Sequence, residues 1–521
     1  MQMAVVDDDH VLIFDKSEHN ALQVNGASAW GSLYTISTKK VRALGMKTNT
    51  FCAGGGWLGN GTMVSVGGNA VENTNPTEDG LTGLRMFTPC GTGDCEIFES
   101  PSRLHLTSDR WYPSTTRLDD GSLIIFGGMI TSGYNNQEST DNPTLEFWPP
   151  KGTGLAVYST FLHDALNTNL FPVTLLLPSG DIFVAANLMA MTYNWRTNKE
   201  TRLPGFKNGV KINYPASPAN ALLPLTIAND WVPEVLICGG TNANTEGYQW
   251  KLTSQTPGSN QCSRMVINTA GIKKGWQIEY MTEARVMSDA ILTPDGQVLL
   301  INGAKTGVAG YGNVKSEVGK SNADNPNYRP TLYNPNAAKG KRFSTHFPSS
   351  SIERLYHSSA SLLPDGRIMV AGSNPNGDVS TTTYETRYDV EMFSPPYVSM
   401  TRPSFKNYPS NMYYGNNFTV TVTLPSGTKD VRAVLMDLGY STHGVHMSQR
   451  WVEMTASLSG KKLTVKAPKK AGIFPPGPGW MYILADGIPS KGFKIMMGDA
   501  STPVVDAAAL KNQQKHTSSS A

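Results

Sequence analysis

A recurring hairpin motif most constrains how this chain can fold. A polar turn with Gly at its corner leads into an apolar strand that ends in small residues, as in residues 118–128 (LDDGSLIIFGG). Each copy is separated from the next by enough chain for four strands and their loops, so the repeat predicts seven four-stranded sheets around a common axis, a β-propeller. The seven copies, some of them weaker, are residues 6–15, 58–68, 118–128, 177–186, 232–240, 293–303 and 363–372.

The Gly-Gly pair that ends several of these strands resembles the kelch signature. Glycine inside a strand pattern marks a place where another backbone approaches too closely for a side chain. The fold class we predict is therefore all-β, a seven-bladed kelch-type β-propeller. The loops at one end of a propeller axis are its usual functional face.

A different pattern begins after about residue 400. Residues 417–424 alternate in polarity, residues 431–436 form an apolar run, and residues 463–467 and 480–485 follow with turn residues between them. These segments predict a C-terminal immunoglobulin-like β-sandwich. We therefore expect three parts: a propeller over residues 1–399, a sandwich over 400–498 and a flexible tail over 499–521, which has few apolar residues.

Composition excludes several classes of protein. The net charge is +3 and only 16% of the residues are charged, against about 25% in an average soluble chain, so nucleic acid is not an expected partner. No apolar run approaches the roughly 18–20 residues that cross a bilayer. The first residues lack the pattern of a secretory signal. We expect a secreted protein whose signal peptide, and a strand that closes the ring, lie upstream of this numbering; Asn60 and Asn417 would then be glycosylation acceptors.

The five cysteines divide into two pairs and one remainder. Cys90 and Cys95 enclose a short flexible loop, and Cys238 and Cys262 flank a polar excursion, so each pair is spaced for a disulfide. Cys52 is left over. It is either a buried, inert thiol or a modified and reactive one.

Two copies of the repeat break their own pattern just before the hairpin. At this position other copies carry apolar residues, whereas these two copies carry Trp111-Tyr112 and Tyr356-His357. These side chains either fill the propeller axis as aromatic packing or converge on it as ligands. His443 and His446 lie in a turn of the sandwich on opposite faces if that segment is extended, so one of them is expected to bind. Tyrosine and histidine donors beside an odd cysteine suit tetragonal Cu(II).

Several motifs together resemble a known family over residues 1 to about 498. The chain resembles the copper radical oxidases, and is more similar to fungal glyoxal oxidase than to the related galactose oxidase. The motifs are residues 51–53 (FCA), 60–68 (NGTMVSVGG), 110–114 (RWYPS), 354–358 (RLYHS), 435–439 (LMDLG) and 441–443 (STH).

The resemblance implies a set of site residues. A thioether crosslink between Cys52 and Tyr112 would make Tyr112 both a copper ligand and a stable radical, with Tyr356 as the axial ligand and His357 and His443 as imidazole ligands of one copper ion. By the same analogy, Tyr356 accepts the hydroxyl proton of the substrate and Tyr112 takes hydrogen from its carbon. Glyoxal oxidases convert small aldehydes such as glyoxal, methylglyoxal and glycolaldehyde into carboxylic acids and reduce O₂ to H₂O₂.

One departure from the family pattern concerns the protection of the radical. Galactose oxidase stacks a tryptophan on its crosslink, and the position that aligns with it here is Ile130. Trp57 is a candidate substitute shield, whereas Trp111 is expected to point to the opposite face of a regular strand and pack in the core. Arg285 is expected to form a surface salt bridge rather than to meet an anionic substrate.

Two alternatives stay open at this point. A copper radical oxidase of primary alcohols, such as galactose-like sugars, would keep all five site residues, and a non-catalytic kelch binding module would need none of them. The expected partners are a small aldehyde and O₂, with peroxidases that consume the peroxide. We expect a monomer.

Overall fold

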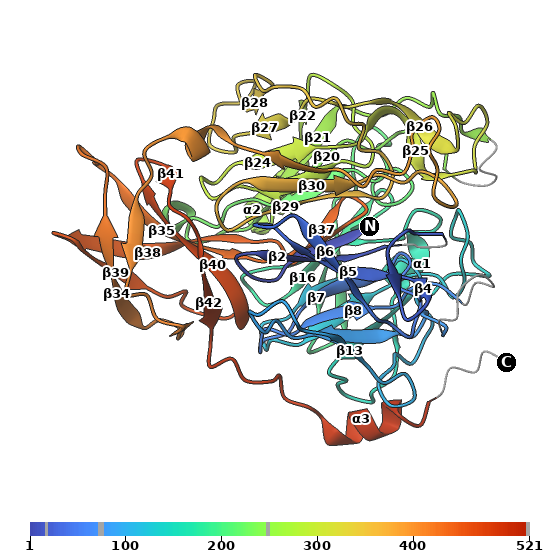
Figure 1. The fold of residues 1–521 in the computed structure, drawn as a ribbon, viewed down its shortest axis with the longest axis horizontal. Helices are drawn as coiled ribbons and strands as arrows, with labels where there is room; N and C mark the ends of the chain where they lie inside the picture. Colours follow the sequence, from blue (N-terminus) through green and yellow to red (C-terminus); the bar gives the residue numbers. More distant parts are fainter. Residues whose placement is uncertain (16–18, 71–77, 246–250, 517–521) are drawn as a thin grey trace.

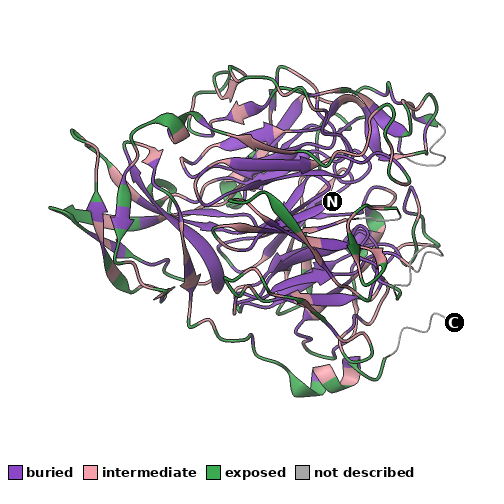
Figure 2. Cartoon of the chain, viewed as in Figure 1, coloured by how far each residue is buried: buried purple, intermediate pink, exposed green. Residues whose placement is uncertain are grey.

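The computed structural model describes residues 1–15, 19–70, 78–245 and 251–516, and it consists mainly of β-strands. Seven sheets surround a common axis, and a separate sheet structure lies against one side of them (Figure 1). The strands nearest the axis are buried (Figure 2). The predicted fold class, a seven-bladed propeller followed by a β-sandwich, is confirmed.

Six of the seven blades contain four antiparallel strands. The first blade has β1 (Gln2–Val5), β2 (His10–Phe14), β5 (Gly31–Thr35) and β6 (Lys40–Leu44), and β3 (Gln23–Val24) and β4 (Ala27–Ser28) pair beside it. The second has β7 (Gly54–Trp57), β8 (Met63–Val66), β9 (Leu84–Phe87) and β10 (Ile97–Glu99). The third has β11 (Ser114–Arg117), β12 (Leu123–Phe126), β13 (Thr144–Trp148) and β14 (Val157–Tyr158).

The remaining blades continue the same order around the ring. The fourth has β15 (Val173–Leu176), β16 (Ile182–Ala186), β17 (Met189–Asn194) and β18 (Lys199–Leu203), and the fifth has β19 (Ala219–Leu222), β20 (Glu234–Cys238), β21 (Gln261–Val266) and β22 (Gln277–Tyr280). The sixth has β23 (Asp289–Leu292), β24 (Val298–Ile301), β27 (Thr331–Tyr333) and β28 (Phe343–Ser344), with the separate hairpin β25 (Ala304–Tyr311) and β26 (Ser321–Pro326). The seventh has β29 (Ser358–Leu362), β30 (Ile368–Gly372) and β31 (Val390–Phe393).

The seven copies of the sequence motif form the second strands of the seven blades. Close approach of another backbone explains the glycines at the ends of these strands, as predicted. A Cβ on Gly68 would stand 2.0 Å from the carbonyl oxygen of Asn49, and a Cβ on Gly239 would stand 2.3 Å from the carbonyl oxygen of Arg285. Only glycine admits so close a backbone approach. Both predicted disulfides, Cys90–Cys95 and Cys238–Cys262, are present, and Cys52 is buried outside them.

The sandwich consists of a chain of paired strands in the order β32-β34-β39-β38-β35-β40-β42-β33, with β41 paired to β40. The four segments anticipated from the sequence are β34, β35, β39 and β40, whereas β32, β33, β38, β41 and β42 were not anticipated. The strands are β32 (Ser404–Lys406), β33 (Asn411–Met412), β34 (Asn417–Thr423), β35 (Val431–Asp437), β38 (Trp451–Ser459), β39 (Lys462–Lys466), β40 (Gly477–Ala485), β41 (Ile488–Pro489) and β42 (Phe493–Met497).

A hairpin of the sandwich enters the propeller axis. Its strands are β36 (Tyr440–Thr442) and β37 (Val445–Met447), and β36 pairs with β1, the innermost strand of the first blade. β37 contacts the inner strands β11, β15, β19 and β23. At the base of the hairpin, the buried side chains of Arg117 and Asp437 form an ion pair between propeller and sandwich. The second domain is thus built into the axis of the first.

The segment expected to be a flexible tail contains one helix. α3 (Ala507–Gln513) begins at Asp506, whose carboxylate accepts hydrogen bonds from the backbone N–H groups of Ala508 and Ala509, as an N-cap does. Asn512 donates a hydrogen bond to the carbonyl oxygen of Thr153, so the helix is attached to the propeller. Residues 517–521 lie outside the described residues. The other helical segments are α1 (Thr160–Asp164), α2 (Thr269–Lys274), η1 (Ile227–Asn229) and η3 (Pro396–Ser399).

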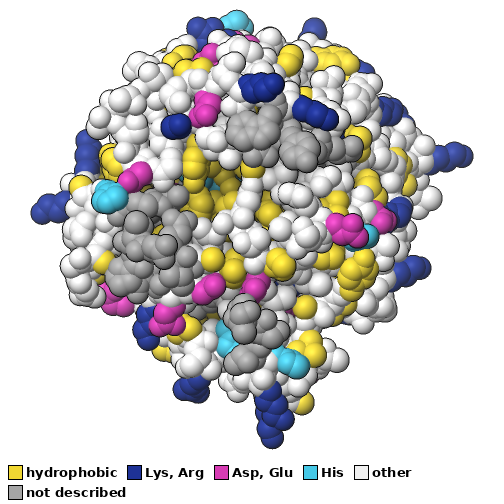
Figure 3. Space-filling view, turned by 90° about the vertical axis from the view of Figure 1, so that its right-hand side faces the viewer, with side chains coloured by type: hydrophobic (Ala, Val, Ile, Leu, Met, Phe, Trp, Pro, Cys, Tyr) yellow, Lys and Arg dark blue, Asp and Glu magenta, His cyan; other side chains and the backbone are white. Residues whose placement is uncertain are grey.

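Within the described residues, none of the helices has the length and apolar character needed to cross a membrane. Figure 3 shows the face of the propeller that lies away from the sandwich, where hydrophobic side chains gather about a central hollow.

Candidate metal centre

The residues before the innermost strands turn their side chains toward the axis. Cys52 precedes β7, Tyr112 precedes β11 and His357 precedes β29, and each has a left-handed backbone, with φ of 59°, 65° and 67°. His443, at the turn between β36 and β37, has φ of 51°. Phe171, Ser217 and Met287 have the same left-handed φ before β15, β19 and β23, so this geometry is a feature of the blades rather than of the site.

Cys52, His357 and His443 form a cluster of potential metal ligands. Their ligand atoms all lie within 4.8 Å of one another, and the Cys52 Sγ atom is 3.5 Å from His443 Nε2 and 4.0 Å from His357 Nε2. All three side chains are buried. The group joins two blades to the sandwich hairpin, so it exists only in the folded chain.

Contacts at Nδ1 of each histidine ring leave Nε2 facing the cluster. His357 Nδ1 lies 3.1 Å from the carbonyl oxygen of Asn374, to which it donates, and His443 Nδ1 lies 2.6 Å from Thr442 Oγ1. With Nδ1 engaged, Nε2 is left with its lone pair directed at the cluster. This is how proteins orient imidazole ligands of metals. Burial also lowers the pKa of His443 well below its usual value, so that its ring stays neutral.

Two tyrosine hydroxyls complete the donor set. The hydroxyl oxygens of Tyr112 and Tyr356 are in direct hydrogen-bonding contact, and the backbone N–H of Tyr112 donates to the carbonyl oxygen of Cys52 at 3.3 Å. Burial, followed by the neighbouring thiol of Cys52, raises the pKa of both phenols well above the usual value. A bound divalent cation would reverse that preference, because its charge stabilises the phenolate.

The donor set fits copper. Two neutral imidazoles and two phenolic oxygens, with a thiol beside them, are the nitrogen and oxygen donors that suit tetragonal Cu(II). The structure places all five predicted site residues, Cys52, Tyr112, Tyr356, His357 and His443, in this one cluster. His446 lies apart from it and packs against Gly439, with its pKa lowered by burial to about 4. Of the two histidines in the hairpin, His443 is the one at the site.

A cavity of about 220 Å³ leads to the two tyrosines. Its described lining is aromatic and polar but carries no charged side chain. Two buried hydrogen-bond donors in this lining, Trp111 Nε1 and the Tyr134 hydroxyl, have no partner among the described residues. A buried donor without an acceptor costs about 1–3 kcal/mol, so these two groups are placed to receive oxygen atoms of a ligand. The lining residues are Phe51, Asn69, Trp111, Tyr112, Ser132, Gly133, Tyr134, Tyr214, Gly310, Tyr311, Asn313 and Tyr356.

Three aromatic rings pack on Tyr112. Their centroids lie at 4.3 Å for Trp111, 4.7 Å for Phe171 and 4.8 Å for Tyr214. The expectation that Trp111 points away from Tyr112 is wrong, because the left-handed φ of Tyr112 interrupts the alternation of a regular strand. The edge of one ring lies against the other, at an interplanar angle of 86°.

Trp57, the candidate shield, lies elsewhere. Its indole nitrogen donates to the carbonyl oxygen of Gly439 at 2.9 Å, and Lys494 Nζ lies 5.7 Å from the centre of its ring. Ile130 is 44% exposed. Trp57 is thus engaged away from Tyr112, whose ring packs against Trp111, Phe171 and Tyr214.

Arg285 is not on the surface. It is 1% exposed, and it donates hydrogen bonds to the carbonyl oxygens of Asn302 and Arg329. Burial lowers its pKa to about 10. The predicted surface salt bridge is wrong because this arginine stabilises the end of a second strand inside its blade.

Sequence reasoning missed Tyr214, although it packs on Tyr112 at the mouth of the site. The repeat gives no signal for it: Tyr214 lies five residues before β19, and the residue of that blade that corresponds to Tyr112 is Ser217.

The comparisons with known families cover nearly the whole described chain. Residues 1–397 match the family described as glyoxal oxidase N-terminus, and residues 402–497 match the family described as galactose oxidase-like, Early set domain.

Two relatives at 31–32% identity agree with this match, and a third is more distant. The chain is 32% identical over 475 residues to aldehyde oxidase GLOX of Vitis pseudoreticulata, covering 87% of this chain and 83% of the relative. It is 31% identical over 499 residues to aldehyde oxidase GLOX1 of Arabidopsis thaliana, covering 90% and 75%. A galactose oxidase of Gibberella zeae is 22% identical over 469 residues, covering 85% and 60%.

A solved structure shares the fold. A fungal alcohol oxidase in complex with copper superimposes with a TM-score of 0.71 at 16% identity, covering 95% of this chain and 96% of that one.

Proposed function

The chain belongs to the glyoxal oxidase family, and from that membership we propose that it is a copper radical oxidase that converts small aldehydes into carboxylic acids. The observation that carries the proposal is the buried cluster of Cys52, two tyrosine hydroxyls and two imidazole Nε2 atoms at the end of a cavity. An aldehyde would react as its hydrate, so that R–CH(OH)₂ and O₂ give R–COOH and H₂O₂.

The proposed ligands of one copper ion are Tyr112, Tyr356, His357 and His443. Cys52 would be joined to Tyr112 by a thioether, formed by loss of one hydrogen from the thiol and one from the ring to O₂. Bound copper would supply one of the two oxidising equivalents of the reaction, and the modified Tyr112 would supply the other. The contact between Tyr112 and Cys52 through the 3.3 Å backbone hydrogen bond supports the pairing.

The chain's own groups have distinct roles in the proposed reaction. The Tyr356 oxygen takes the proton of a substrate hydroxyl, and the adjacent Tyr112 oxygen takes hydrogen from the carbon. Trp111 Nε1 and the Tyr134 hydroxyl donate hydrogen bonds to the substrate's oxygens, for which they have no competing partner among the described residues. Holding the substrate in reactive geometry is the main contribution that such contacts make to the rate.

Two features support an aldehyde rather than a sugar alcohol as substrate. The relatives at 31–32% identity are named aldehyde oxidases, whereas the galactose oxidase is 22% identical. The cavity of about 220 Å³ is below the usual range of about 300–1,000 Å³ for ligand pockets, which favours a very small substrate. Oxidation of primary alcohols is the second candidate, since a solved alcohol oxidase has the same fold.

The decisive experiment compares substrates and a single variant. Protein loaded with copper in air should form H₂O₂ with methylglyoxal or glyoxal at a kcat/KM at least tenfold above that with galactose or a simple primary alcohol. The reverse ranking would replace the aldehyde proposal with the alcohol one. Absence of peroxide with every substrate, from protein with a full copper complement, would contradict an oxidase.

The Cys52→Ser variant tests the radical site. We expect it to fold, because Ser is close in size to Cys, yet to lose oxidase activity by at least a hundredfold. Peptide mass spectrometry of the parent protein should show the peptides of Cys52 and Tyr112 joined and lighter by two hydrogen atoms. A free Cys52 thiol in an active enzyme would contradict the crosslink.

We also propose an extracellular location and peroxidases as consumers of the product. The two disulfides support the location, since disulfides persist in oxidising compartments. Recovery of the active protein from culture medium with glycans on Asn60 or Asn417 would test it, and recovery only from the cell interior would contradict it.

A further inference from the structure

Two buried arginines border one small cavity at the junction of the propeller and the sandwich. Arg117 ends β11, the innermost strand of the third blade, and Arg450 immediately precedes β38 of the sandwich. The side chain of Arg117 has no exposed surface, and Arg450 is 3% exposed. Bulk water therefore solvates neither of the two positive charges, and both must be stabilised by groups inside the protein.

One carboxylate accompanies these two arginines. Asp437 forms an ion pair with Arg117, whereas Arg450 has no ion pair among the described residues. Burial lowers the pKa of Arg450 to about 10, while the Asp437 carboxylate favours its charge and Arg117 opposes it. Two positive charges and one negative charge leave one buried positive charge in excess. A buried charge without a counter-charge is costly, so the junction lacks one negative charge.

Arg117 also has hydrogen-bond donors without an acceptor. Its Nη2 atom contacts Asp437, whereas its Nε and Nη1 atoms have no partner among the described residues. Arg450 is held by carbonyl oxygens, since its Nη1 donates to Ile473 at 2.7 Å and its Nη2 donates to Leu176. A guanidinium has five N–H donors, and these contacts do not use all of them. Buried donors left in this way indicate an ion or a water molecule that completes the set.

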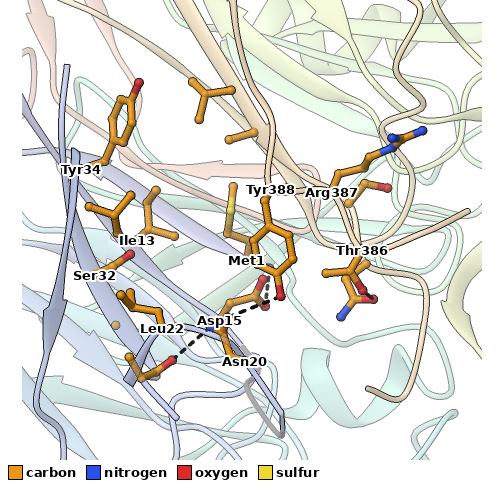
Figure 4. Close-up of a pocket in the computed structure, with 18 of the residues that line it drawn as sticks. Met1, Ile13, Asp15, Asn20, Leu22, Ser32, Tyr34, Thr386, Arg387 and Tyr388 are labelled. Carbon is orange, nitrogen blue, oxygen red and sulfur yellow. Dashed lines mark hydrogen bonds and ion pairs between the residues drawn. The ribbon is translucent and has the colours of Figure 1, made fainter. Parts of the chain in front are cut away.

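The volume of the junction cavity limits what can occupy it. It measures about 10 Å³, close to the roughly 10–15 Å³ that one water molecule needs. The cavity between the first and seventh blades is very different, since its volume of about 700 Å³ is enough for many solvent molecules (Figure 4). Sulfate, phosphate and carboxylates are too large for the junction cavity. A water molecule or a monatomic ion remains.

The lining of this cavity favours an anion. Its described residues include two arginines and no carboxylate. The Ser448 hydroxyl oxygen accepts a hydrogen bond from the backbone N–H of Arg117 at 3.0 Å, and its own O–H has no acceptor among the described residues. Leu175, Leu222 and Pro475 add apolar surface, where opposite charges attract each other more strongly than in water. A water molecule could accept these hydrogen bonds but would not balance the charge.

We propose that this cavity binds one chloride ion between Arg117, Arg450 and Ser448. The ion would balance the excess positive charge and accept hydrogen bonds from donors of both domains. Residues 448–450 connect β37 with β38, so the bound ion would hold this connection against the third blade. Arg117 lies at the opposite end of β11 from Tyr112, and the proposal does not depend on the oxidase activity.

Bromide locates the ion in the parent protein. It has the charge of chloride, is only slightly larger and scatters X-rays anomalously, so crystals of the whole protein grown without chloride are soaked in bromide. We expect an anomalous peak inside the cavity that Arg117 and Arg450 line. Bromide found only elsewhere, or a water molecule in the cavity of the soaked crystals, would overturn the proposal.

Thermal unfolding with two matched variants measures what the ion contributes. At constant ionic strength, replacing gluconate, which is too large for the cavity, with about 100 mM chloride should raise the Tm of the parent by about 2 °C or more. Arg450→Met removes the excess charge and should abolish this shift. Arg285→Met removes a similarly buried arginine outside the cavity and should keep the shift. Equal shifts in the two variants, or none in the parent, would overturn the assignment.

Asp437→Asn should change the chloride effect in the opposite direction. It removes the one carboxylate that accompanies the two arginines, so the excess of buried positive charge doubles. We expect a larger chloride-dependent rise in Tm than in the parent, although the variant itself is less stable. A smaller or equal rise would show that the charge of the cavity does not determine binding, and would contradict the proposal.

Discussion

At the scale of single residues, the candidate site combines strained backbones with unsatisfied donors. Cys52, Tyr112, His357 and His443 all have left-handed φ, a conformation that costs non-glycine residues of the order of 1–2 kcal/mol each. Trp111 Nε1 and the Tyr134 hydroxyl are buried without an acceptor among the described residues. The backbone strain recurs at Phe171, Ser217 and Met287 and therefore belongs to the blades, whereas the two unsatisfied donors are consistent with a site shaped for ligands.

Tyr134 gives a prediction that separates function from structure. Because its hydroxyl has no partner among the described residues, Tyr134→Phe should leave the free energy of unfolding unchanged or raise it by up to about 1 kcal/mol. If the hydroxyl contacts substrate, the same variant should lower kcat/KM for methylglyoxal about tenfold. Urea unfolding and peroxide formation measure the two effects. A loss of stability with unchanged kinetics would show that the hydroxyl is structural.

Asp289 provides a prediction about pH. This buried carboxyl accepts hydrogen bonds from Asn302 Nδ2 at 2.8 Å and from Ser441 Oγ at 3.3 Å, yet burial outweighs them and raises its pKa to about 7. The unfolded pKa is about 3.9, so between pH 4 and 7 the folded state binds more protons than the unfolded state. The stability that Asp289 contributes is therefore present below pH 4 and lost as the pH rises through 7.

The Asp289→Asn variant should isolate this effect. Its stability relative to the parent protein should rise by up to about 4 kcal/mol between pH 4 and pH 7 and change little above pH 8. Urea unfolding at a series of pH values measures the difference. A difference that is independent of pH would mean that Asp289 is ionised in the folded protein throughout.

At the scale of elements, a buried arginine binds the end of the second strand in four of the seven blades. Arg85, Arg110, Arg285 and Arg354 donate hydrogen bonds to the backbone carbonyls of Gly67, Gly127, Asn302 and Gly372, at the ends of second strands. Arg110 and Arg354 also pair with a carboxylate, whereas Arg285 bonds mainly to carbonyls. The arginine thus recurs in these four blades even though its other partners vary.

This difference between arginines is testable. Arg110→Met should lower the free energy of unfolding by about 3–5 kcal/mol, because it leaves the Glu146 carboxylate, 3% exposed, without its cation. Arg285→Met should lower the free energy of unfolding by only about 1–3 kcal/mol, because it leaves carbonyl oxygens without a donor but leaves no buried charge without a partner. The two variants are compared by urea denaturation under one condition. Equal losses would show that the carbonyl contacts, and not the ion pair, carry the stability.

At the scale of the whole molecule, the sandwich is a structural part of the propeller. Its hairpin places His443 beside Cys52, and its base is held by the Arg117–Asp437 ion pair, both of whose side chains are fully buried. Arg450 adds a hydrogen bond to the carbonyl oxygen of Leu176, and Trp451 Nε1 donates to that of Pro294 at 2.9 Å. The position of one proposed ligand therefore depends on an interface between domains.

Asp437→Ala tests this dependence. Removing one partner of a buried ion pair should cost about 3–5 kcal/mol, because Arg117 is left as an uncompensated buried charge. We expect copper affinity to fall as well, at least tenfold, because the hairpin that carries His443 loses its support. Thermal unfolding and copper titration measure the two effects. Loss of stability with unchanged copper affinity would show that β36 and β37 are held in place by the axis alone.

The sequence by itself determined the repeat, and with it the architecture. A turn and an apolar strand recurring seven times can bury their apolar faces only by stacking sheets on one another, so the propeller follows from local pattern alone. The spacing of Cys90 with Cys95 and of Cys238 with Cys262 likewise predicted two disulfides that are present. The motifs around Cys52, Tyr112, Tyr356, His357 and His443 pointed to residues that do meet.

Only the tertiary structure decided which neighbours surround those residues. A left-handed φ at Tyr112 redirects Trp111 onto its ring, and burial between blades turns Arg285 from a surface residue into a core one. The helix at residues 507–513 also depends on what lies opposite it in space. Periodicity records which face of an element is buried, but the partner on that face comes from distant parts of the chain, and only folding brings the two together.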